Sequence, residues 1–88
     1  MASYQVEVTQ QVRKEIRHLP GNVRQRVVRI LQALRQEPFP SNSRLLDLTK
    51  VKIELPSDLK LCRIRLDSWR IVYVIEAELN LISVLAIR

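Results

Sequence analysis

Alternation of hydrophobic and polar residues is most regular between Lys60 and Ile75, in the sequence KLCRIRLDSWRIVYVI. Successive side chains of a β-strand point to opposite faces, so this alternation predicts two strands. Between them, the polar pair Asp67-Ser68 has the composition of a tight turn. A two-residue turn predicts these cross-strand pairs: Leu66 with Trp69, Arg65 with Arg70, Ile64 with Ile71 and Arg63 with Val72.

The two faces of this predicted hairpin differ in chemistry, because directly opposed residues of an antiparallel pair share a face. One face carries Ile64, Leu66, Trp69, Ile71 and Tyr73, and the other carries Arg63, Arg65 and Arg70 beside Val72. The plain interpretation of the arginines is a solvated outer face of a sheet that is buried on one side. Neighbouring like charges lower stability unless an anion is bound, so we favour a binding or catalytic surface.

The first half of the chain predicts one strand and two helices. Tyr4, Val6 and Val8 alternate with polar residues, which indicates a strand, and Thr9 can cap a helix after it. Three- and four-residue spacing predicts the buried stripe of that helix: Val12, Ile16 and Leu19. Pro20-Gly21 ends it.

A second, longer helix is predicted to begin at Asn22, which forms a capping-box pattern with Gln25. Pro38 and Pro40 end it. Its apolar stripe comprises Val23, Val27, Ile30, Leu31 and Leu34. Neither helix is long enough to be stable alone, so the helical hairpin needs a sheet to cover.

The remaining strands are less regular. Residues 44–48 predict a short extended segment, and residues 49–58, with Lys50 and Lys52, a basic loop or a briefly paired strand. A turn over residues 76–78 leads to a last strand, Leu79 to Ile87. Pairing Ile75 with Leu79 places Arg70 opposite Val84. This register puts Val84, Ala86 and Arg88 on the arginine face and Leu81, Ser83, Leu85 and Ile87 on the apolar face.

These elements predict an α+β fold in one domain, residues 1–88. It consists of an N-terminal strand, an α-helical hairpin and then an antiparallel meander of three or four strands. The helices are expected to pack on the sheet face that carries Ile64, Ile71, Tyr73, Leu81 and Leu85. The opposite face, with the arginines, is expected to be open to solvent.

Charge and composition narrow the classes of function. The net charge is +6, and arginine supplies 11 of the 15 basic residues, which favours a nucleic-acid or acidic protein partner. One histidine and one cysteine, Cys62, exclude a thiolate zinc site and a disulfide framework. We expect no metal and no cofactor. No apolar run approaches the length of a membrane span and no signal-peptide pattern is present, so a cytoplasmic location is expected.

Several individual residues outside the arginine face are expected to have structural rather than catalytic roles. Trp69 and Tyr73 are expected in the core rather than as base-stacking platforms. Cys62 is expected to be a small buried residue, and Asp67 a turn former. His18, at the end of the first helix, is expected to interact with the helix dipole.

Five segments in order resemble the RelE/ParE family of bacterial toxins from type II toxin–antitoxin pairs. They are YQVEVTQQVRKEIRHLP, VRQRVVRILQALRQEPFP, SRLLDL, CRIRLDSWRIVYVI and LISVLAIR, and together they cover nearly the whole chain. The resemblance implies a toxin that a cognate antitoxin neutralises, with DNA contacted only through that antitoxin. RelE-like members cut messenger RNA in the ribosomal A site, whereas ParE-like members poison DNA gyrase.

The resemblance also implies roles for particular residues. Arg63 and Arg65 match the basic pair of RelE-like toxins that supplies catalysis and phosphate binding, and Arg70 matches the arginine that stabilises the transition-state phosphate. We predict a metal-independent endoribonuclease with these three arginines at its centre. Additional RNA phosphate contacts are predicted for Lys50, Lys52, Lys60 and Arg88.

Two departures from the family keep alternatives open. Arginines stand where RelE-like enzymes often have lysines, and a guanidinium that stays protonated is a poor general base. The basic, tyrosine-containing tail of the family is missing after Arg88, which substitutes for part of it at most. A ParE-like gyrase inhibitor and an inactive antitoxin-binding relic are therefore the alternatives to a ribosome-dependent ribonuclease.

Overall fold

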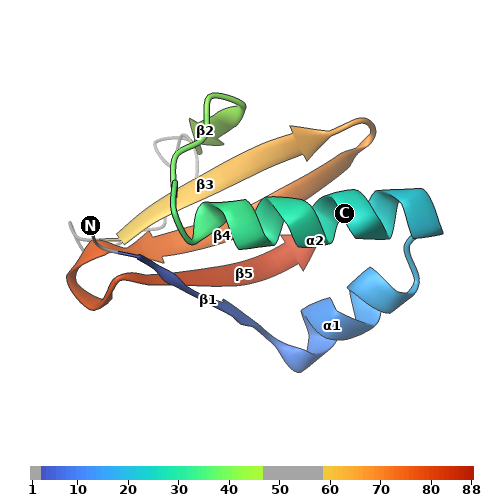
Figure 1. The fold of residues 1–88 in the computed structure, drawn as a ribbon, viewed down its shortest axis with the longest axis horizontal. Coiled ribbons are helices and arrows are strands. Elements are labelled where there is room, and N and C mark those ends of the chain that lie inside the picture. The colour runs from blue at the N-terminus through green and yellow to red at the C-terminus, as the bar shows by residue number, and fades with distance from the viewer. Residues whose placement is uncertain (1–2, 47–58) are drawn as a thin grey trace.

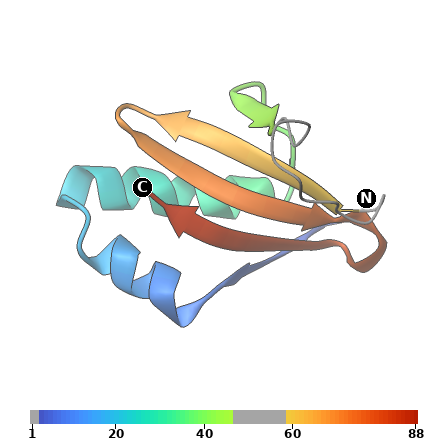
Figure 2. The ribbon, with the colours of Figure 1, turned by 180° about the vertical axis from the view of Figure 1, so that it is seen from behind.

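The computed structural model describes residues 3–46 and 59–88, which form a curved sheet with two helices over one of its faces (Figure 1). Seen from behind, the other face of the three long strands carries neither of the two described helices (Figure 2). The elements are β1 (Gln5–Val8), α1 (Gln10–Arg17), α2 (Gly21–Leu34), β2 (Ser43–Leu45), β3 (Leu59–Leu66), β4 (Trp69–Glu76), a 3₁₀ turn η1 (Ala77–Leu79) and β5 (Leu81–Ile87). The predicted α+β class, with both helices on one face, is confirmed.

The sheet has five described strands in the order β1-β5-β4-β3-β2. The strands β2 to β5 are antiparallel to their neighbours, as the predicted meander requires. β1 pairs with β5 in parallel, with Val6 opposite Ile82 and Val8 opposite Val84. The sheet is therefore mixed rather than purely antiparallel, because the helical hairpin carries the chain back between β1 and the meander.

Helix α1 begins as predicted, since the Val12 backbone N–H donates to Thr9 Oγ1 at 3.1 Å. The capping box at Asn22 is wrong. Helix α2 already begins at Gly21, directly after Pro20, and has no side-chain cap. The short link places Asn22 inside the first turn, where its backbone is helical and cannot serve as the cap.

The core lies between the helices and one sheet face. Its helix side consists of Val12, Val23, Val27, Leu31 and Leu34 from the two helices and Leu19 from the link between them. Its sheet part consists of Cys62, Ile64, Leu66, Ile71, Tyr73, Ile75, Ile82, Val84 and Ile87. The predicted burial of Cys62 and Tyr73 is confirmed, and Trp69 is partly buried against this core. Removal of apolar surface from water, which stabilises the folded state by about 25 cal/mol per Å2, is the main stabilising contribution in such a layer.

The predicted register of the last strand is wrong. Ile75 lies opposite Ile82 rather than Leu79. The connection is longer than a tight turn, because residues 77–79 form a 3₁₀ turn and Asn80 adopts a left-handed conformation with φ 49°. The shift moves Ile82 and Val84 into the core, where both are fully buried, whereas Leu81 and Ser83 lie on the outer face.

A β-bulge then reverses part of this error. Tyr73 pairs with Val84, but Val72 pairs with Ala86, so Leu85 is an extra residue on β5. Leu85 is 48% exposed instead of buried. After the bulge the alternation returns to the predicted phase, with Ile87 in the core and Ala86 on the outer face. An extra residue changes which face every following side chain occupies.

Strand β2 is shorter than the predicted segment 44–48 and starts at Ser43. The predicted basic loop over residues 49–58 lies outside the described residues. Within the described ranges, neither helix is both long and apolar enough to cross a membrane.

Candidate nucleic-acid interface

The predicted β3–β4 hairpin is confirmed pair by pair, including Leu66 opposite Trp69 and Ile64 opposite Ile71. Asp67 and Ser68 form the turn, and Asp67 adopts φ 55°, a conformation that Asp tolerates better than most residues. Arg65 consequently lies directly opposite Arg70. Both are exposed and project from the face away from the buried Ile64 and Ile71.

The last residue extends this pair into a row. The Arg88 N–H donates to the Arg70 carbonyl at 3.0 Å, and the Arg70 N–H donates to the Arg88 carbonyl at 2.6 Å. Residues that exchange both bonds lie directly opposite and share a face. Arg65, Arg70 and Arg88, here called the arginine row, therefore cross three adjacent strands side by side. Arg70 faces Arg88 and not Val84 as predicted, because of the longer turn and the bulge.

The other side of β3 adds a residue that the sequence had not singled out. Arg44 on β2 lies directly opposite Arg63 on β3, on the same face as the arginine row. A pocket of about 440 Å3 opens beside them, lined by Ser41, Asn42, Arg44, Arg63 and Arg65. The five residues Arg44, Arg63, Arg65, Arg70 and Arg88 are called the arginine cluster below.

The polar wall of this pocket is held by the connection that follows α2. Tyr73 Oη, inside the core, donates to the Pro38 carbonyl at 2.9 Å. The Ser43 backbone N–H and Ser43 Oγ both donate to the Pro40 carbonyl, at 2.9 and 2.7 Å. These bonds close the turn that presents Ser41 and Asn42 beside Arg63. Burial of the hydroxyl raises the pKa of Tyr73 to about 12, so it remains a neutral donor at physiological pH.

The far end of β5 is anchored by α1. Strand β1 ends opposite Val84, so the backbone of β5 beyond that point has no strand on this side. Glu15 Oε2 takes the place of a strand acceptor and receives the Ile87 N–H at 3.0 Å. This bond holds the residue that precedes Arg88 and thereby helps to place the end of the arginine row.

The cluster carries positive charge without local neutralisation among the described residues. Within residues 3–46 and 59–88, the one ion pair joins Arg26 Nη1 of α2 to Asp67 Oδ2 at 2.7 Å. Arg65 instead donates its Nε to the Asp67 backbone carbonyl at 3.3 Å. Directly opposed like charges are unfavourable in a sheet. An anionic ligand would relieve this repulsion, and guanidinium groups bind phosphate bidentately.

Among residues 3–46 and 59–88, the basic side chains of the outer face gather at one end of the three long strands. Further from the turn, Arg63 lies beside Val72 and Ala86 on the neighbouring strands. Two residues further along β3, Leu61 lies beside Val74 and Ser83. The candidate interface is therefore a compact arginine patch at the hairpin end, bordered by half-buried apolar residues.

The predicted lysines do not join this patch in the described structure. Lys60 pairs with the buried Ile75, which places it on the helix-side face, and its Nζ lies 5.4 Å from the centre of the Phe39 ring. Lys50 and Lys52 lie outside the described residues. Lys60 as an RNA contact remains a prediction that this position does not favour.

Other reactive groups are remote from the arginine cluster. His18 caps the end of α1, and its Nδ1 lies 2.7 Å from the Lys14 carbonyl. Cys62 is buried, and this burial raises the pKa of its thiol. Over the part of the chain that the structure describes, no three His, Cys, Asp or Glu residues are grouped as metal ligands would be.

Comparison with known proteins identifies the fold. An archaeal RelE–RelB complex from Pyrococcus horikoshii superposes with a TM-score of 0.77 at 28% identity, covering 98% of this chain and 93% of that one. The toxin–antitoxin complex RelBE2 from Mycobacterium tuberculosis gives a TM-score of 0.73 at 23% identity, covering 97% and 95%. The isolated E. coli RelE toxin gives 0.67 at 22% identity, covering 97% and 82%. Neither the protein-family models nor the curated protein sequences give a match.

The fold and the arginine cluster define a small α+β protein whose described helices cover one sheet face, while the other face is basic at the hairpin end. Its fold is that of the RelE chain in the archaeal RelE–RelB complex. The chain is RelE-like in its fold, and the RelE-like side of the resemblance that the sequence indicated is confirmed.

Proposed function

We propose that this protein is the toxin of a toxin–antitoxin pair and cleaves messenger RNA on the ribosome. The observation that carries the proposal is the arginine row, in which Arg65, Arg70 and Arg88 lie side by side on the sheet face away from the helices. The adjoining pocket extends the positive surface to Arg63 and Arg44. The structural similarity to a RelE chain supports the same proposal.

The proposed reaction needs no covalent bond to the protein. The RNA 2′-oxygen loses its proton and attacks the adjacent phosphorus, and the bond from phosphorus to the 5′-oxygen breaks. The products are a 2′,3′-cyclic phosphate and a 5′-hydroxyl, which takes up a proton. Negative charge grows on the non-bridging oxygens during this step, and fixed cations lower the barrier by stabilising that charge.

The geometry suggests a division of work within the cluster. Arg65 and Arg70 face each other across the hairpin, so two guanidinium groups can flank one phosphate. Arg63 and Arg44 lie further along the same face beside Ser41 and Asn42, where a neighbouring phosphate or ribose would be held. Arg88 continues the row on the opposite side of Arg70.

Proton transfer is the part of the reaction that this face supplies least well. Arginine keeps its proton in proteins, so none of the five residues is an efficient base. In the proposed mechanism, the protein therefore contributes electrostatic stabilisation and part of the alignment of the RNA, and binding of the RNA to the ribosome supplies the rest of that alignment. Oxyanion-type stabilisation by one donor is typically worth about 100-fold or more in rate.

An antitoxin partner follows from the same proposal. The RelE chains from Pyrococcus horikoshii and Mycobacterium tuberculosis are in complexes with their antitoxins. A partner of this protein would need acidic groups to neutralise the arginine cluster and would thereby compete with RNA.

Mapping of transcript ends tests the proposal. Expression of the chain should create new messenger RNA ends at translated codons, and Arg65→Ala combined with Arg70→Ala should abolish them. The matched control is Arg17→Ala with Arg29→Ala, which removes the same charge from exposed helix positions. Arrested growth with intact transcripts would refute cleavage. Inhibition of purified gyrase would then favour the ParE-like alternative, and the lack of any growth effect would favour an inactive antitoxin-binding relic.

A further inference from the structure

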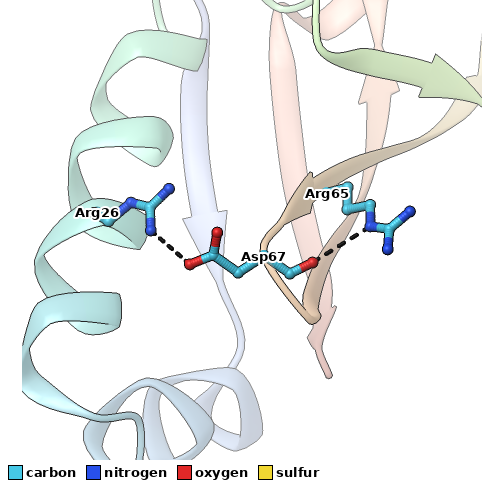
Figure 3. A network of polar contacts seen from close by, with 3 residues as sticks. All are labelled: Arg26, Arg65 and Asp67. Atoms are coloured by element: carbon cyan, nitrogen blue, oxygen red, sulfur yellow. Dashed lines mark hydrogen bonds and ion pairs between the residues drawn. The ribbon is translucent and has the colours of Figure 1, made fainter.

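Asp67 makes two different contacts from the tip of the β3–β4 hairpin (Figure 3). Its carboxylate points toward α2 and accepts from Arg26 Nη1 at 2.7 Å. Its backbone carbonyl points the other way and accepts from Arg65 Nε at 3.3 Å. The carboxylate and the Arg65 guanidinium therefore lie on opposite sides of the turn, although the two residues are only two positions apart.

This ion pair is a poor candidate for a stabilising clamp. The Arg26 side chain is 47% exposed and the Asp67 side chain 63% exposed. Exposed pairs of this kind add little to stability and are screened by salt. Its effect on the location of charge is larger, because Asp67 carries the negative charge of the hairpin turn and its backbone carbonyl is in contact with Arg65 of the arginine row.

We propose that Arg26 is a positioning residue that draws the Asp67 carboxylate to the helix side and so keeps the Arg65 guanidinium available for a phosphate. Arg65 uses only Nε in its contact with Asp67, which leaves its two terminal nitrogens directed away from the turn. Without Arg26, the nearest cation that contacts Asp67 is Arg65 itself. The freed carboxylate would then rotate toward Arg65 and compete with the phosphate for the same donors.

The competing interpretation is that the pair only fixes the shape of the turn. Asp67 has φ 55°, which asparagine tolerates as well as aspartate. Asp67→Asn therefore removes the charge while the turn keeps its preferred backbone. In our proposal this variant retains phosphate binding, because no carboxylate remains to compete.

A double-mutant cycle separates the two interpretations. The variants are Arg26→Gln, Asp67→Asn, the two combined, and Arg26→Lys as the charge-preserving control. Affinity for inorganic phosphate is followed by NMR of the Arg65 Nε–Hε signal, identified by its loss in Arg65→Lys. Arg26→Gln should weaken phosphate binding about three- to tenfold at low salt, as expected for one competing charge near the site.

The decisive outcome is rescue. Phosphate binding by the double variant should return to the wild-type affinity, and Arg26→Lys should stay close to it. A fixed-shape role instead predicts that Asp67→Asn weakens binding as much as Arg26→Gln and that the double variant shows no recovery. That result would overturn the inference, as would an Arg65 signal that phosphate does not affect in the wild-type protein.

The proposed catalytic importance of this effect rests on the function proposed above. Ribosome-dependent cleavage by the same four variants should follow the order of their phosphate affinities. If no protein cleaves RNA but the phosphate cycle behaves as described, the ribonuclease proposal fails and the role of Arg26 stands. If cleavage by the wild type is normal and Arg26→Gln binds phosphate and cleaves equally well, the role of Arg26 fails alone.

Discussion

Arg70 and Arg88 lie directly opposite each other and exchange both of their backbone hydrogen bonds, at 2.6 and 3.0 Å. Arg70 also lies opposite Arg65 on its other side. Arg70 is therefore the centre of the arginine row, and its guanidinium has a like charge on either side. Evolution of a stable sheet alone would not favour this arrangement, because opposed like charges are destabilising.

Replacement of Arg70 should separate activity from stability. Arg70→Ala is expected to lower cleavage of ribosome-bound messenger RNA about 100-fold or more, because it removes a cation from the centre of the row. The free energy of unfolding in urea should stay unchanged or rise slightly, since two repulsive neighbours are relieved. Arg70→Lys serves as the control that retains charge but loses the planar fork. A large loss of stability in Arg70→Ala would contradict this account.

Arg44 should matter for activity even though it lies on a strand distant in sequence from the hairpin. Arg44→Ala is expected to weaken RNA binding about tenfold, the value of one charge-assisted phosphate contact. Arg29→Ala, at an exposed position on α2, removes the same charge and should have little effect. The measurement is binding of single-stranded RNA at fixed salt. An equal loss of RNA affinity in both variants would show that Arg44 acts only through the overall charge of the protein.

Tyr73 should make the protein less stable in alkali. The pKa of its hydroxyl rises from 10.0 to about 12 in the folded protein. The folded state thus keeps the proton that the unfolded chain releases first, and stability present below pH 10 is lost as the pH rises through about 12. Above pH 12 the loss approaches about 3 kcal/mol. Urea unfolding between pH 8 and 11 measures the part of this loss that occurs below pH 11. Cys62 adds a contribution of the same sign because the pKa of its thiol is also raised.

Tyr73→Phe is the matched variant for this experiment. It should cost about 1 kcal/mol at pH 7, because the Pro38 carbonyl loses its donor. It should also flatten the alkaline decline in stability, leaving the share due to Cys62. An unchanged decline in this variant would show that another group titrates.

Glu15 should stabilise the end of β5 through its bond to the Ile87 N–H. Glu15→Ala is expected to lower the free energy of unfolding by about 1–2 kcal/mol, because it leaves a partly buried N–H without an acceptor. Glu15→Gln keeps an acceptor oxygen and should lose less than half as much. Hydrogen exchange at the Ile87 amide provides the local readout, and equal protection in all three proteins would contradict the role.

The sequence was sufficient to predict those parts of the structure that depend on residues close to one another along the chain. The hairpin predicted from Lys60 to Ile75 follows from strict alternation and a two-residue turn, and every predicted pair is present in the observed strands β3 and β4. The buried stripe of α2 follows equally from local spacing. These features need no knowledge of the rest of the fold.

The β4–β5 connection shows where local reasoning stops. Asn80 readily adopts the left-handed conformation that ends the longer turn, but the alternation of residues 79–87 fits a tighter turn, which was predicted at residues 76–78. The bulge at Leu85 has no signal in the sequence. The pairing of Arg44 with Arg63 and of Arg26 with Asp67 joins segments that are distant along the chain, so spacing alone could not predict either.

Leu85 has a consequence that its own solvent-exposed side chain does not reveal. If Leu85 instead paired regularly opposite Val72, every later side chain would change face, and the guanidinium of the final residue would point to the oily interior beneath the helices rather than to the aqueous surface. The direction in which the chain presents its last positive charge thus depends on an irregularity three residues upstream.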